Sequence, residues 1–310
     1  MTKDKSIQQI VTVAMCTYNG AAYLREQLDS VVNQTYKNLE IVIVDDMSSD
    51  NTLEIIKEYQ QKDPRIRIYR NERNLGYNKN FEKAVGLANG NYIAPCDQDD
   101  IWEPAKIEIM MKDWTPGSLF IYALSGSFYN DDFESRKQAP RVYYANIDNI
   151  YSLVFNSPVH GHACMFKKEL LSFCVPFPAD IFYDWWISMH AAGMGVIGCV
   201  PHTLTWHRVH EKNSSRTLTS IKNEEERNSQ LRQQSAYFIE TFYGKNMTKE
   251  KKSLLRYAAI LKNMDGKKFS RAMFTWVVKH RKQVFHYKKK PFVFLSHLKH
   301  AYRMAYNGLL

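Results

Sequence analysis

Over the first hundred residues, short apolar runs alternate with stretches in which apolar residues recur every three or four positions. The runs are rich in β-branched residues and predict buried strands at 10–16, 39–44, 66–69 and 91–96. The stretches between them have the spacing of amphipathic helices, as in Leu24, Leu28 and Val31. This alternation predicts an α/β fold with a Rossmann-like, mostly parallel sheet flanked by helices. In such a sheet, ligands bind beyond the carboxyl ends of the strands.

Composition places the chain among folded globular proteins. Its 310 residues are 45% hydrophobic and 24% charged, which excludes a disordered or fibrous protein. The five cysteines are scattered and never spaced as C-x-x-C, which disfavours a disulfide framework and fits a reducing compartment. No apolar run approaches the roughly 18 residues of a membrane-spanning helix, and the first ten residues lack the apolar core of a signal peptide. We therefore expect a cytoplasmic protein.

Basic residues are concentrated towards the C-terminal end. Residues 241–310 contain 17 Lys and Arg but 2 Asp and Glu, so the other 240 residues contain 25 basic and 30 acidic side chains. Aromatic residues are interleaved with the basic clusters at 267–268, 280–282 and 288–290. We expect a basic α-helical region at 216–310 that docks on an anionic membrane surface. Each Lys or Arg near such a surface strengthens binding by about 1 kcal/mol. A solvated helical subdomain is the alternative, and nucleic-acid binding is disfavoured because no recognition motif is present.

Acidic residues follow two of the predicted strands. Asp45 and Asp46 end one strand, and D-Q-D-D at 97–100 ends another, so five carboxylates are expected at one edge of the sheet. Such crowding is costly unless cations or hydrogen-bond donors compensate for it, which indicates a site. Neither a G-x-G-x-x-G fingerprint nor a P-loop is present to bind phosphates. A divalent cation held by carboxylates can bind a diphosphate instead, and oxygen ligands suit Mg²⁺ or Mn²⁺.

Motifs in the chain resemble those of one enzyme family. They are V-A-M-C-T-Y-N at 13–19, V-D-D-M-S-S-D-N-T at 44–52, N-L-G at 74–76 and C-D-Q-D-D-I-W at 96–102. In this order and spacing, they resemble family 2 glycosyltransferases of the GT-A fold. Y-D-W-W at 183–186 and W-H-R-V-H-E-K-N at 206–213 resemble the D-W-W and R-x-H segments of the bacterial rhamnosyltransferase-like branch. The resemblance covers about residues 10–215.

The resemblance implies a domain organisation and a nucleotide site. A GT-A catalytic domain is expected over 1–215, with a nucleotide-binding half at about 1–115 and an acceptor half at about 116–215. Asp46 corresponds to the residue that accepts a hydrogen bond from the base, and Asp97 to one that contacts the ribose or metal-bound waters. The nucleotide-binding positions carried over are Thr17, Tyr18, Asn19, Asp46, Lys79, Asn80 and Asp97.

The resemblance also implies a metal and a catalytic base. Asp99 corresponds to the direct ligand of Mn²⁺ or Mg²⁺, with Asp97 and His210 beside it, and His207 is the alternative to His210. Asp184 corresponds to the general base of an inverting transfer, in which a carboxylate removes the proton of the acceptor hydroxyl. Aromatic neighbours are expected to bury Asp184 and to raise its pKa. Taken alone, Asp184 also suits the start of a helix, where it would only be a cap.

The acceptor side is expected to include Gly161, His162, Trp185 and Trp186. The H-G-H segment at 160–162 also admits a zinc site with His202 or His207, which the absence of a Cys or Glu partner at ligand spacing disfavours. A loop that lines the acceptor site is favoured instead, with Gly161 allowing close approach of the backbone.

Together these features predict a metal-dependent, inverting transfer of one sugar to a growing cell-surface polysaccharide or lipid-linked glycan, at the inner face of a bacterial plasma membrane. The branch resemblance points to dTDP-rhamnose as the donor, with UDP-hexoses as the alternative. The alternative outside the enzymes is a non-catalytic protein that binds nucleotide sugars or acts as a membrane scaffold. No Q-x-x-R-W motif follows D-W-W, which favours single addition over processive synthesis.

Overall fold

A computed structural model describes residues 9–138, 146–148, 150–179, 181–211, 213, 224–245, 251–265, 268–285 and 293–308. The chain divides into two compact units, of which unit 1 comprises 1–148 and 159–210 and unit 2 comprises 149–158 and 211–310. Residues 149–158 thus group with the C-terminal helices, although the sequence analysis counts them with the acceptor half. Lys267 and the basic cluster at 288–290 lie outside the described residues.

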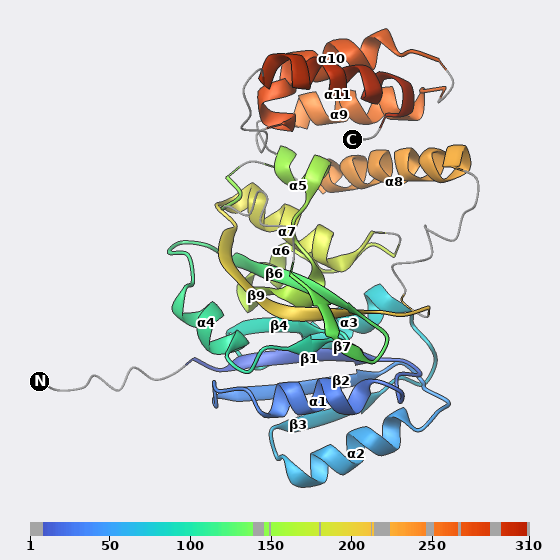
Figure 1. The fold of residues 1–310 in the computed structure, drawn as a ribbon. Coiled ribbons are helices and arrows are strands. Elements are labelled where there is room, and N and C mark those ends of the chain that lie inside the picture. Colours follow the sequence, from blue (N-terminus) through green and yellow to red (C-terminus); the bar gives the residue numbers. More distant parts are fainter. Residues whose placement is uncertain are drawn as a thin grey trace, which may run out of the picture. The chain divides into compact units, whose positions relative to one another are not determined.

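Unit 1 is built on one mixed sheet (Figure 1). Its strands are β1 (Val11–Thr17), β2 (Leu39–Asp45), β3 (Ile66–Arg70), β4 (Tyr92–Cys96), β5 (Ile101–Trp102), β6 (Phe120–Tyr129), β7 (Asp132–Lys137), β8 (Cys164–Lys167) and β9 (Gly198–Val209). Their order is β3-β2-β1-β4-β8-β6-β9-β5, and β7 pairs with β6. The strands from β3 to β4 are parallel to one another, as the sequence predicts. Beyond β4, antiparallel pairs predominate, and only β6 and β9 run parallel.

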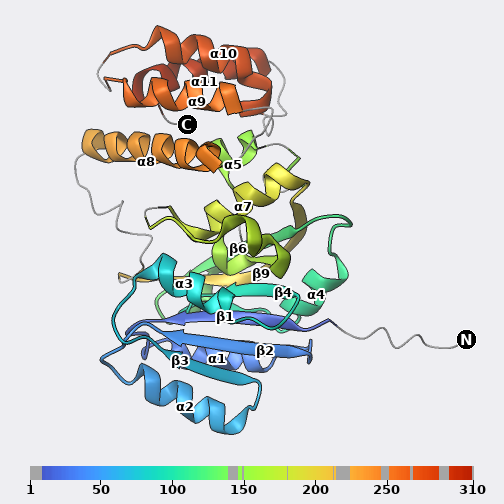
Figure 2. The same ribbon diagram turned by 180° about the vertical axis from the view of Figure 1, so that it is seen from behind.

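Helices cover both faces of the parallel strands. Those of unit 1 are α1 (Leu24–Val32), α2 (Thr52–Lys62), α3 (Tyr77–Gly86), α4 (Lys106–Lys112), α6 (Leu171–Cys174) and α7 (Tyr183–Met194), with 3₁₀ turns η1 (Gly161–Ala163) and η2 (Lys168–Leu170). Leu28 of α1 and Ile56 of α2 share a buried cluster with Val13 of β1. Helix α3 lies on the opposite face of the sheet from α1 (Figure 2). Burial on both faces explains why these strands read as continuous apolar runs.

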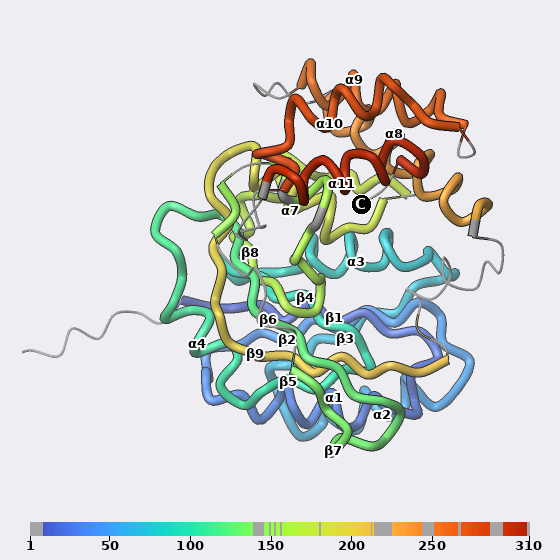
Figure 3. The backbone as a smooth tube through the Cα atoms, turned by 45° about the horizontal axis from the view of Figure 1, so that its top comes forward, coloured from blue at the N-terminus to red at the C-terminus, as the bar shows by residue number. Residues whose placement is uncertain are grey.

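Strand register brings the polar segments to one edge. Thr17 at the end of β1 lies opposite Asp45 of β2, and Met15 lies opposite Cys96 of β4. The residues that follow β1, β2 and β4 therefore meet. Strand β9 runs beside β6 (Figure 3), and its Trp206 pairs with Ile101 of β5. This last pairing brings residues 207–210 to the 97–100 turn.

Unit 2 is helical, which confirms the expectation of a helical C-terminal region. Its helices are α5 (Tyr151–Asn156), α8 (Glu224–Lys245), α9 (Lys251–Lys262), α10 (Arg271–Val284) and α11 (Val293–Asn307). An aromatic cluster lies in its core, where the ring of Tyr257 is 4.8 Å from Phe155 and 4.7 Å from Trp276. Among the described residues, no helix is both long enough and apolar enough to cross a lipid bilayer.

Candidate active site

The ends of β1 and β2 are joined by hydrogen bonds. The Asp46 amide donates to the Thr17 carbonyl at 2.8 Å, and the Asn19 amide donates to Ser48 Oγ at 2.9 Å. Asn19 has a positive φ of 48°, and its Oδ1 accepts from the Ser49 amide at 2.8 Å. Thr17 is buried, whereas Tyr18 is half exposed and remains open to a ligand.

Gln98 ties this loop to the acidic turn after β4. Its Oε1 accepts from the Tyr18 amide at 2.8 Å, and its Nε2 donates to the Tyr18 carbonyl at 3.1 Å. A Cβ atom on Gly20 would lie against the Gln98 amide and displace it from these two hydrogen bonds. The two parts of the expected nucleotide site are therefore held side by side through Gln98.

Asp45 and Asp46, two of the five carboxylates expected at this edge, are each compensated by hydrogen-bond donors. Asp45 is fully buried and accepts from the Ser48 amide at 3.0 Å. Asp46 accepts from the Leu75 amide at 2.8 Å and from the Gly76 amide at 2.9 Å. Donors of the neighbouring loops thus compensate for both charges, and Asp46 orders the N-L-G segment.

Lys79 and Asn80, the two residues of α3 that are expected to bind the nucleotide, have different partners. Asn80 is buried, and its Nδ2 donates to the Val44 carbonyl at 3.0 Å while its Oδ1 accepts from Asn71 at 2.9 Å. The Lys79 ammonium instead pairs with Glu82 at 2.9 Å. In this structure Asn80 therefore supports the end of β2 and bonds to the protein through both ends of its amide group.

Asp99 meets His210 at the end of β4. The distance between Asp99 Oδ2 and His210 Nε2 is 2.8 Å, and Arg208 Nε donates to the Asp99 carbonyl at 2.9 Å. Burial raises the pKa of Asp99, and the hydrogen bond from His210 opposes this rise. With Asp97 beside them, these side chains offer two carboxylates and one imidazole. The two carboxylates suit Mn²⁺ or Mg²⁺, and the imidazole favours Mn²⁺ of these two ions.

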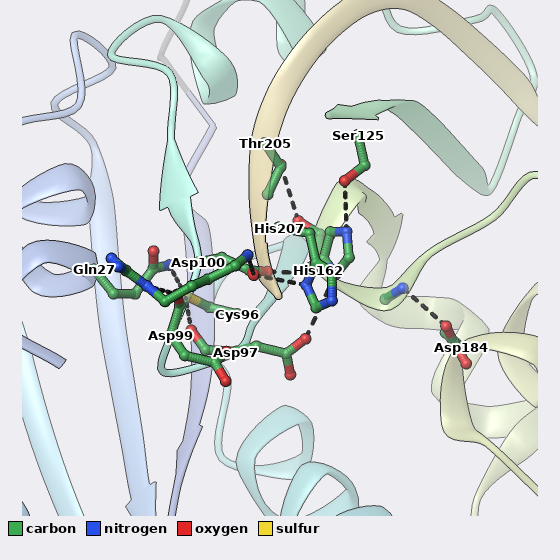
Figure 4. A network of polar contacts seen from close by, with 12 residues as sticks. Gln27, Cys96, Asp97, Asp99, Asp100, Ser125, His162, Asp184, Thr205 and His207 are labelled. Atoms are coloured by element: carbon green, nitrogen blue, oxygen red, sulfur yellow. Dashed lines mark hydrogen bonds and ion pairs between the residues drawn. The ribbon is translucent and has the colours of Figure 1, made fainter. Parts of the chain in front are cut away.

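Asp100, although adjacent to Asp99, contacts a different histidine (Figure 4). Its Oδ1 accepts from His207 Nδ1 at 2.9 Å and from the Arg208 amide at 3.2 Å. Burial alone would raise the pKa of Asp100, but the positive charges of His162 and His207 outweigh it and lower this pKa to about 2. Burial lowers the pKa of His207, but the hydrogen bond to Asp100 and the surrounding carboxylates raise it to about 9.

His162 lies between Ser125 and the acidic turn (Figure 4). Its Nε2 is 2.8 Å from Ser125 Oγ, and its Nδ1 is 3.3 Å from Asp100 Oδ2. The His162 carbonyl accepts from Lys106 Nζ at 2.6 Å and from Thr205 Oγ1 at 3.2 Å. Lys106 is completely buried, and this burial lowers its pKa to about 7.

Asp184 lies in the first turn of α7 and contacts η1. Its Oδ2 accepts from the Gly161 amide at 2.8 Å, and its Oδ1 accepts from the Trp185 amide at 2.8 Å. Burial raises the pKa of Asp184 strongly enough to outweigh these two bonds, and the charge of Asp97 raises it further. The side chain is thus held by two backbone donors, and its pKa is shifted in the direction that the sequence analysis expects.

The residues expected on the acceptor side separate into two groups. Trp186 is completely buried and donates from Nε1 to the Cys174 carbonyl, so it presents no ring face to an acceptor, which corrects that expectation. Gly161 and His162 are buried as well, and they support Asp184 and the acidic turn. Trp185 keeps partial exposure and stays a candidate for contact with a sugar.

Sequence reasoning missed three buried residues that organise the site. Asp100 and Lys106 form the contacts described above. Arg208 is completely buried, pairs with Glu26 at 2.6 Å, and lies over the ring of Tyr23 at 4.6 Å from its centroid. Arg208 belongs to the R-x-H segment, so the motif contained a signal for it. No pattern in the sequence indicates that Lys106 is buried.

Replacing Gly161 by alanine is expected to destabilise unit 1 by about 1–3 kcal/mol, the usual cost of overpacking. A Cβ atom there would lie 2.8 Å from Tyr183 Cζ and closer still to its hydroxyl. Tyr183 is buried and stacked on Phe81 at 4.2 Å, so it has little room to move. Urea unfolding measures the loss, and Gly86→Ala is the matched control because no atom lies within 4 Å of its added Cβ. Equal stability of the two variants would contradict this packing.

The pair of His207 and Asp100 is expected to make stability depend on pH. The folded-state pKa of His207, about 9, lies above its unfolded value of about 6.5, so its contribution is complete below pH 6.5 and is lost as pH rises through 9. In EDTA, the free energy of unfolding of the wild type should therefore fall between pH 6 and pH 9.5, by about 1–3 kcal/mol more than that of His207→Gln. Urea unfolding at the two pH values tests this, and a constant difference would refute it.

The chain is similar in sequence to known glycosyltransferases. Residues 12–173, just over half of the chain, match the model of "Glycosyl transferase family 2". An uncharacterised glycosyltransferase of Haemophilus influenzae is 28% identical over 69% of this chain and 70% of its own length. The putative teichuronic acid biosynthesis glycosyltransferase TuaG of Bacillus subtilis is 31% identical over 42% of this chain and 58% of its own length.

Two solved structures share the fold. Staphylococcus aureus TarS 1–349 in complex with UDP-GlcNAc has a TM-score of 0.60 and 17% identity, and the match covers 96% of this chain and 90% of TarS 1–349. The mannosyltransferase PcManGT of Pyrobaculum calidifontis, in complex with GDP-Man and Mn²⁺, has a TM-score of 0.58 and 18% identity over 98% of this chain and 82% of its own. The expected α/β fold of GT-A type is thus confirmed.

Proposed function

The chain belongs to glycosyl transferase family 2, and from this premise we propose that it transfers one sugar, with inversion, from a nucleotide-sugar donor to a growing polysaccharide or lipid-linked glycan. The complexes of TarS with UDP-GlcNAc and of PcManGT with GDP-Man support a nucleotide-sugar donor. The name of the Bacillus subtilis relative supports a polysaccharide as the product.

The position of Asp184 is the observation that carries the proposal. It lies on α7 beside η1, close enough to the acidic turn that the charge of Asp97 contributes to its raised pKa. The amides of Gly161 and Trp185 hold the two carboxylate oxygens and thereby orient the group. We assign Asp184 as the general base that removes the proton of the acceptor hydroxyl as the hydroxyl attacks the anomeric carbon.

Asp99, Asp97 and His210 are the residues that would hold the divalent metal. When bound, the metal neutralises charge on the leaving nucleoside diphosphate. Arg208 holds the backbone of Asp99, and His210 holds its carboxylate, so the ligand is positioned from β9. On the nucleotide side, Tyr18 and the segment ordered by Asp46 are available to bind the base.

For the donor, we propose dTDP-rhamnose, with UDP-hexoses as the alternative. The support is the resemblance of 183–186 and 206–213 to the rhamnosyltransferase-like branch. Donor hydrolysis tests both the class and the donor: the full-length chain is incubated with dTDP-, UDP- and GDP-sugars, with Mn²⁺ or with EDTA. We expect Mn²⁺-dependent release of the nucleoside diphosphate from one donor. Failure of every donor to bind in the presence of Mn²⁺, measured by calorimetry, would refute the proposal.

For unit 2, we propose docking on an anionic membrane surface, at the inner face of the plasma membrane. On α11 the exposed Leu295, Lys299 and Tyr302 follow one another along one face, and Phe294 and Arg303 flank them. Apolar and basic side chains on one helix face suit an anionic lipid interface. Sedimentation with anionic vesicles tests this. The double variant Leu295→Ser, Tyr302→Ser should bind less, and unchanged binding, or equal binding to neutral vesicles, would refute it.

A further inference from the structure

We propose that Asp100, His162 and His207 form a second metal site, which takes a divalent transition metal of the Zn²⁺ class and is separate from the site at Asp99 and His210. One ligand atom from each of the three residues lies within 4.8 Å of the other two. The residues come from the turn after β4, from η1 and from β9, so a bound ion would join three segments. The inference goes beyond the proposed transfer reaction and does not depend on it.

The unpaired oxygen of Asp100 is the first observation. Its Oδ1 receives two hydrogen bonds, but Oδ2 is buried and has no hydrogen-bond partner. A buried carboxylate oxygen without a partner is costly. The nearest candidate, His162 Nδ1, lies 3.3 Å away but without hydrogen-bond geometry. A cation between these two atoms would satisfy both.

The position of the His162 ring is the second observation. Its Nε2 lies 2.8 Å from Ser125 Oγ, and this contact fixes the orientation of the ring. Its Nδ1 then faces Oδ2 of Asp100 at 3.3 Å and Oδ2 of Asp97 at 3.6 Å. A neutral imidazole that donates from Nε2 has its lone pair on Nδ1, where it can bind a cation.

The surroundings resemble those of a built metal site. Ligating histidines ordinarily have their other nitrogen fixed by a second group, as Ser125 fixes His162 here. The rings of His162 and His207 are nearly parallel, with centroids 5.1 Å apart and an angle of 7° between their planes. In a tetrahedral zinc site the ligand atoms lie roughly 3.3 Å apart. The distance between His162 Nδ1 and Asp100 Oδ2 has this value.

The donor set favours Zn²⁺ over Mg²⁺. Two imidazoles and one carboxylate suit Zn²⁺, whereas Mg²⁺ prefers oxygen ligands alone. A water molecule would complete the four ligands. The sequence analysis disfavoured zinc at the H-G-H segment because no partner lay at ligand spacing. The fold supplies that partner in Asp100, which lies outside the segment.

The experiment uses the full-length chain, freed of metal with a chelator, with Co²⁺ as a spectroscopic probe and Zn²⁺ as its competitor. Co²⁺ bound by imidazoles in a four- or five-coordinate site absorbs strongly in the visible range, whereas octahedral Co²⁺ on oxygen ligands absorbs weakly. We expect one strongly absorbing Co²⁺ per chain, displaced by one Zn²⁺. The variants His207→Gln and His162→Gln should each lose this band. His202→Gln, an exposed histidine on the same strand, should keep it.

The variant Asp99→Asn distinguishes the two sites. It removes the expected ligand of the metal that takes part in transfer, and it should leave the Co²⁺ band intact. A second readout is thermal unfolding, in which Zn²⁺ at about 100 times its dissociation constant should raise the midpoint of the wild type by roughly 5 °C but not that of His207→Gln. A wild type without the band, a band that survives in His207→Gln, or a band that is lost in Asp99→Asn would each overturn the proposal.

Discussion

Replacing Asp184 by asparagine is expected to lower the rate of sugar transfer by about 10²–10⁴-fold, the range that general acid–base catalysis contributes. Asparagine keeps the size of the side chain but does not take up a proton at neutral pH. Because the expected nucleotide positions lie at the ends of β1, β2 and β4 and on α3, rather than on α7, donor affinity should change little. The measurement is the rate at saturating donor and acceptor, together with donor affinity by calorimetry in the presence of Mn²⁺.

Two comparisons sharpen this test. Glu169→Gln removes an exposed acidic charge from the same unit and should keep the wild-type rate. The pH profile of the wild type should fall on the acid side, through a pKa above the ordinary aspartate value, since burial raises the pKa of Asp184. An Asp184→Asn variant that turns over at the wild-type rate would show that Asp184 only caps α7.

The second large effect is expected at Asp99. Its replacement by asparagine should remove the Mn²⁺ dependence and lower transfer by roughly 10²–10⁴-fold, because a metal contributes several kcal/mol to stabilising the charge on the leaving group. His210 Nε2 lies 2.8 Å from Asp99 Oδ2, and the variant His210→Gln should lose less of the transfer rate than Asp99→Asn. The measurement is the rate as a function of Mn²⁺ concentration after treatment with EDTA.

The two variants should differ in how they bind the donor. Asp99→Asn should weaken donor binding in Mn²⁺, whereas Asp184→Asn should not, because only the former acts on the diphosphate side. Asp113→Asn, which follows α4, controls for the loss of one acidic charge. If Asp99→Asn kept both the Mn²⁺ response and the donor affinity of the wild type, the metal would have to be held by other residues.

Much of the secondary structure of unit 1 could be predicted from the local pattern of apolar residues. The strands expected at 10–16 and 39–44 are β1 and β2 to within one residue at each end, because continuous apolar runs mark strands that are buried on both faces. The antiparallel β8 and the long β9 were not expected. Their pairing partners are distant in sequence, and short-range periodicity contains no information about them.

For the site, the direction of the side chains was the main feature that the sequence did not predict. The motifs located Asp99 and Asp184 in the chain, but they did not show that Trp186 faces the core, or that Asn80 is buried and bonds to Val44 and Asn71. Neighbouring residues can point to opposite sides of the backbone, so membership of a motif does not decide which of them a ligand can reach.

Local sequence was enough to predict the alternation of strands and helices, the acidic ends of β2 and β4, and the family, because each of these depends on residues that are close together in the chain. The contact of Asp99 with His210, and those of Asp100 with His207 and His162, became evident from the folded chain. The pairing of β5 with β9 brings His207 and His210 to the acidic turn, and η1 brings His162. These partners of Asp99 and Asp100 are far apart in sequence, so local pattern contains no information about them.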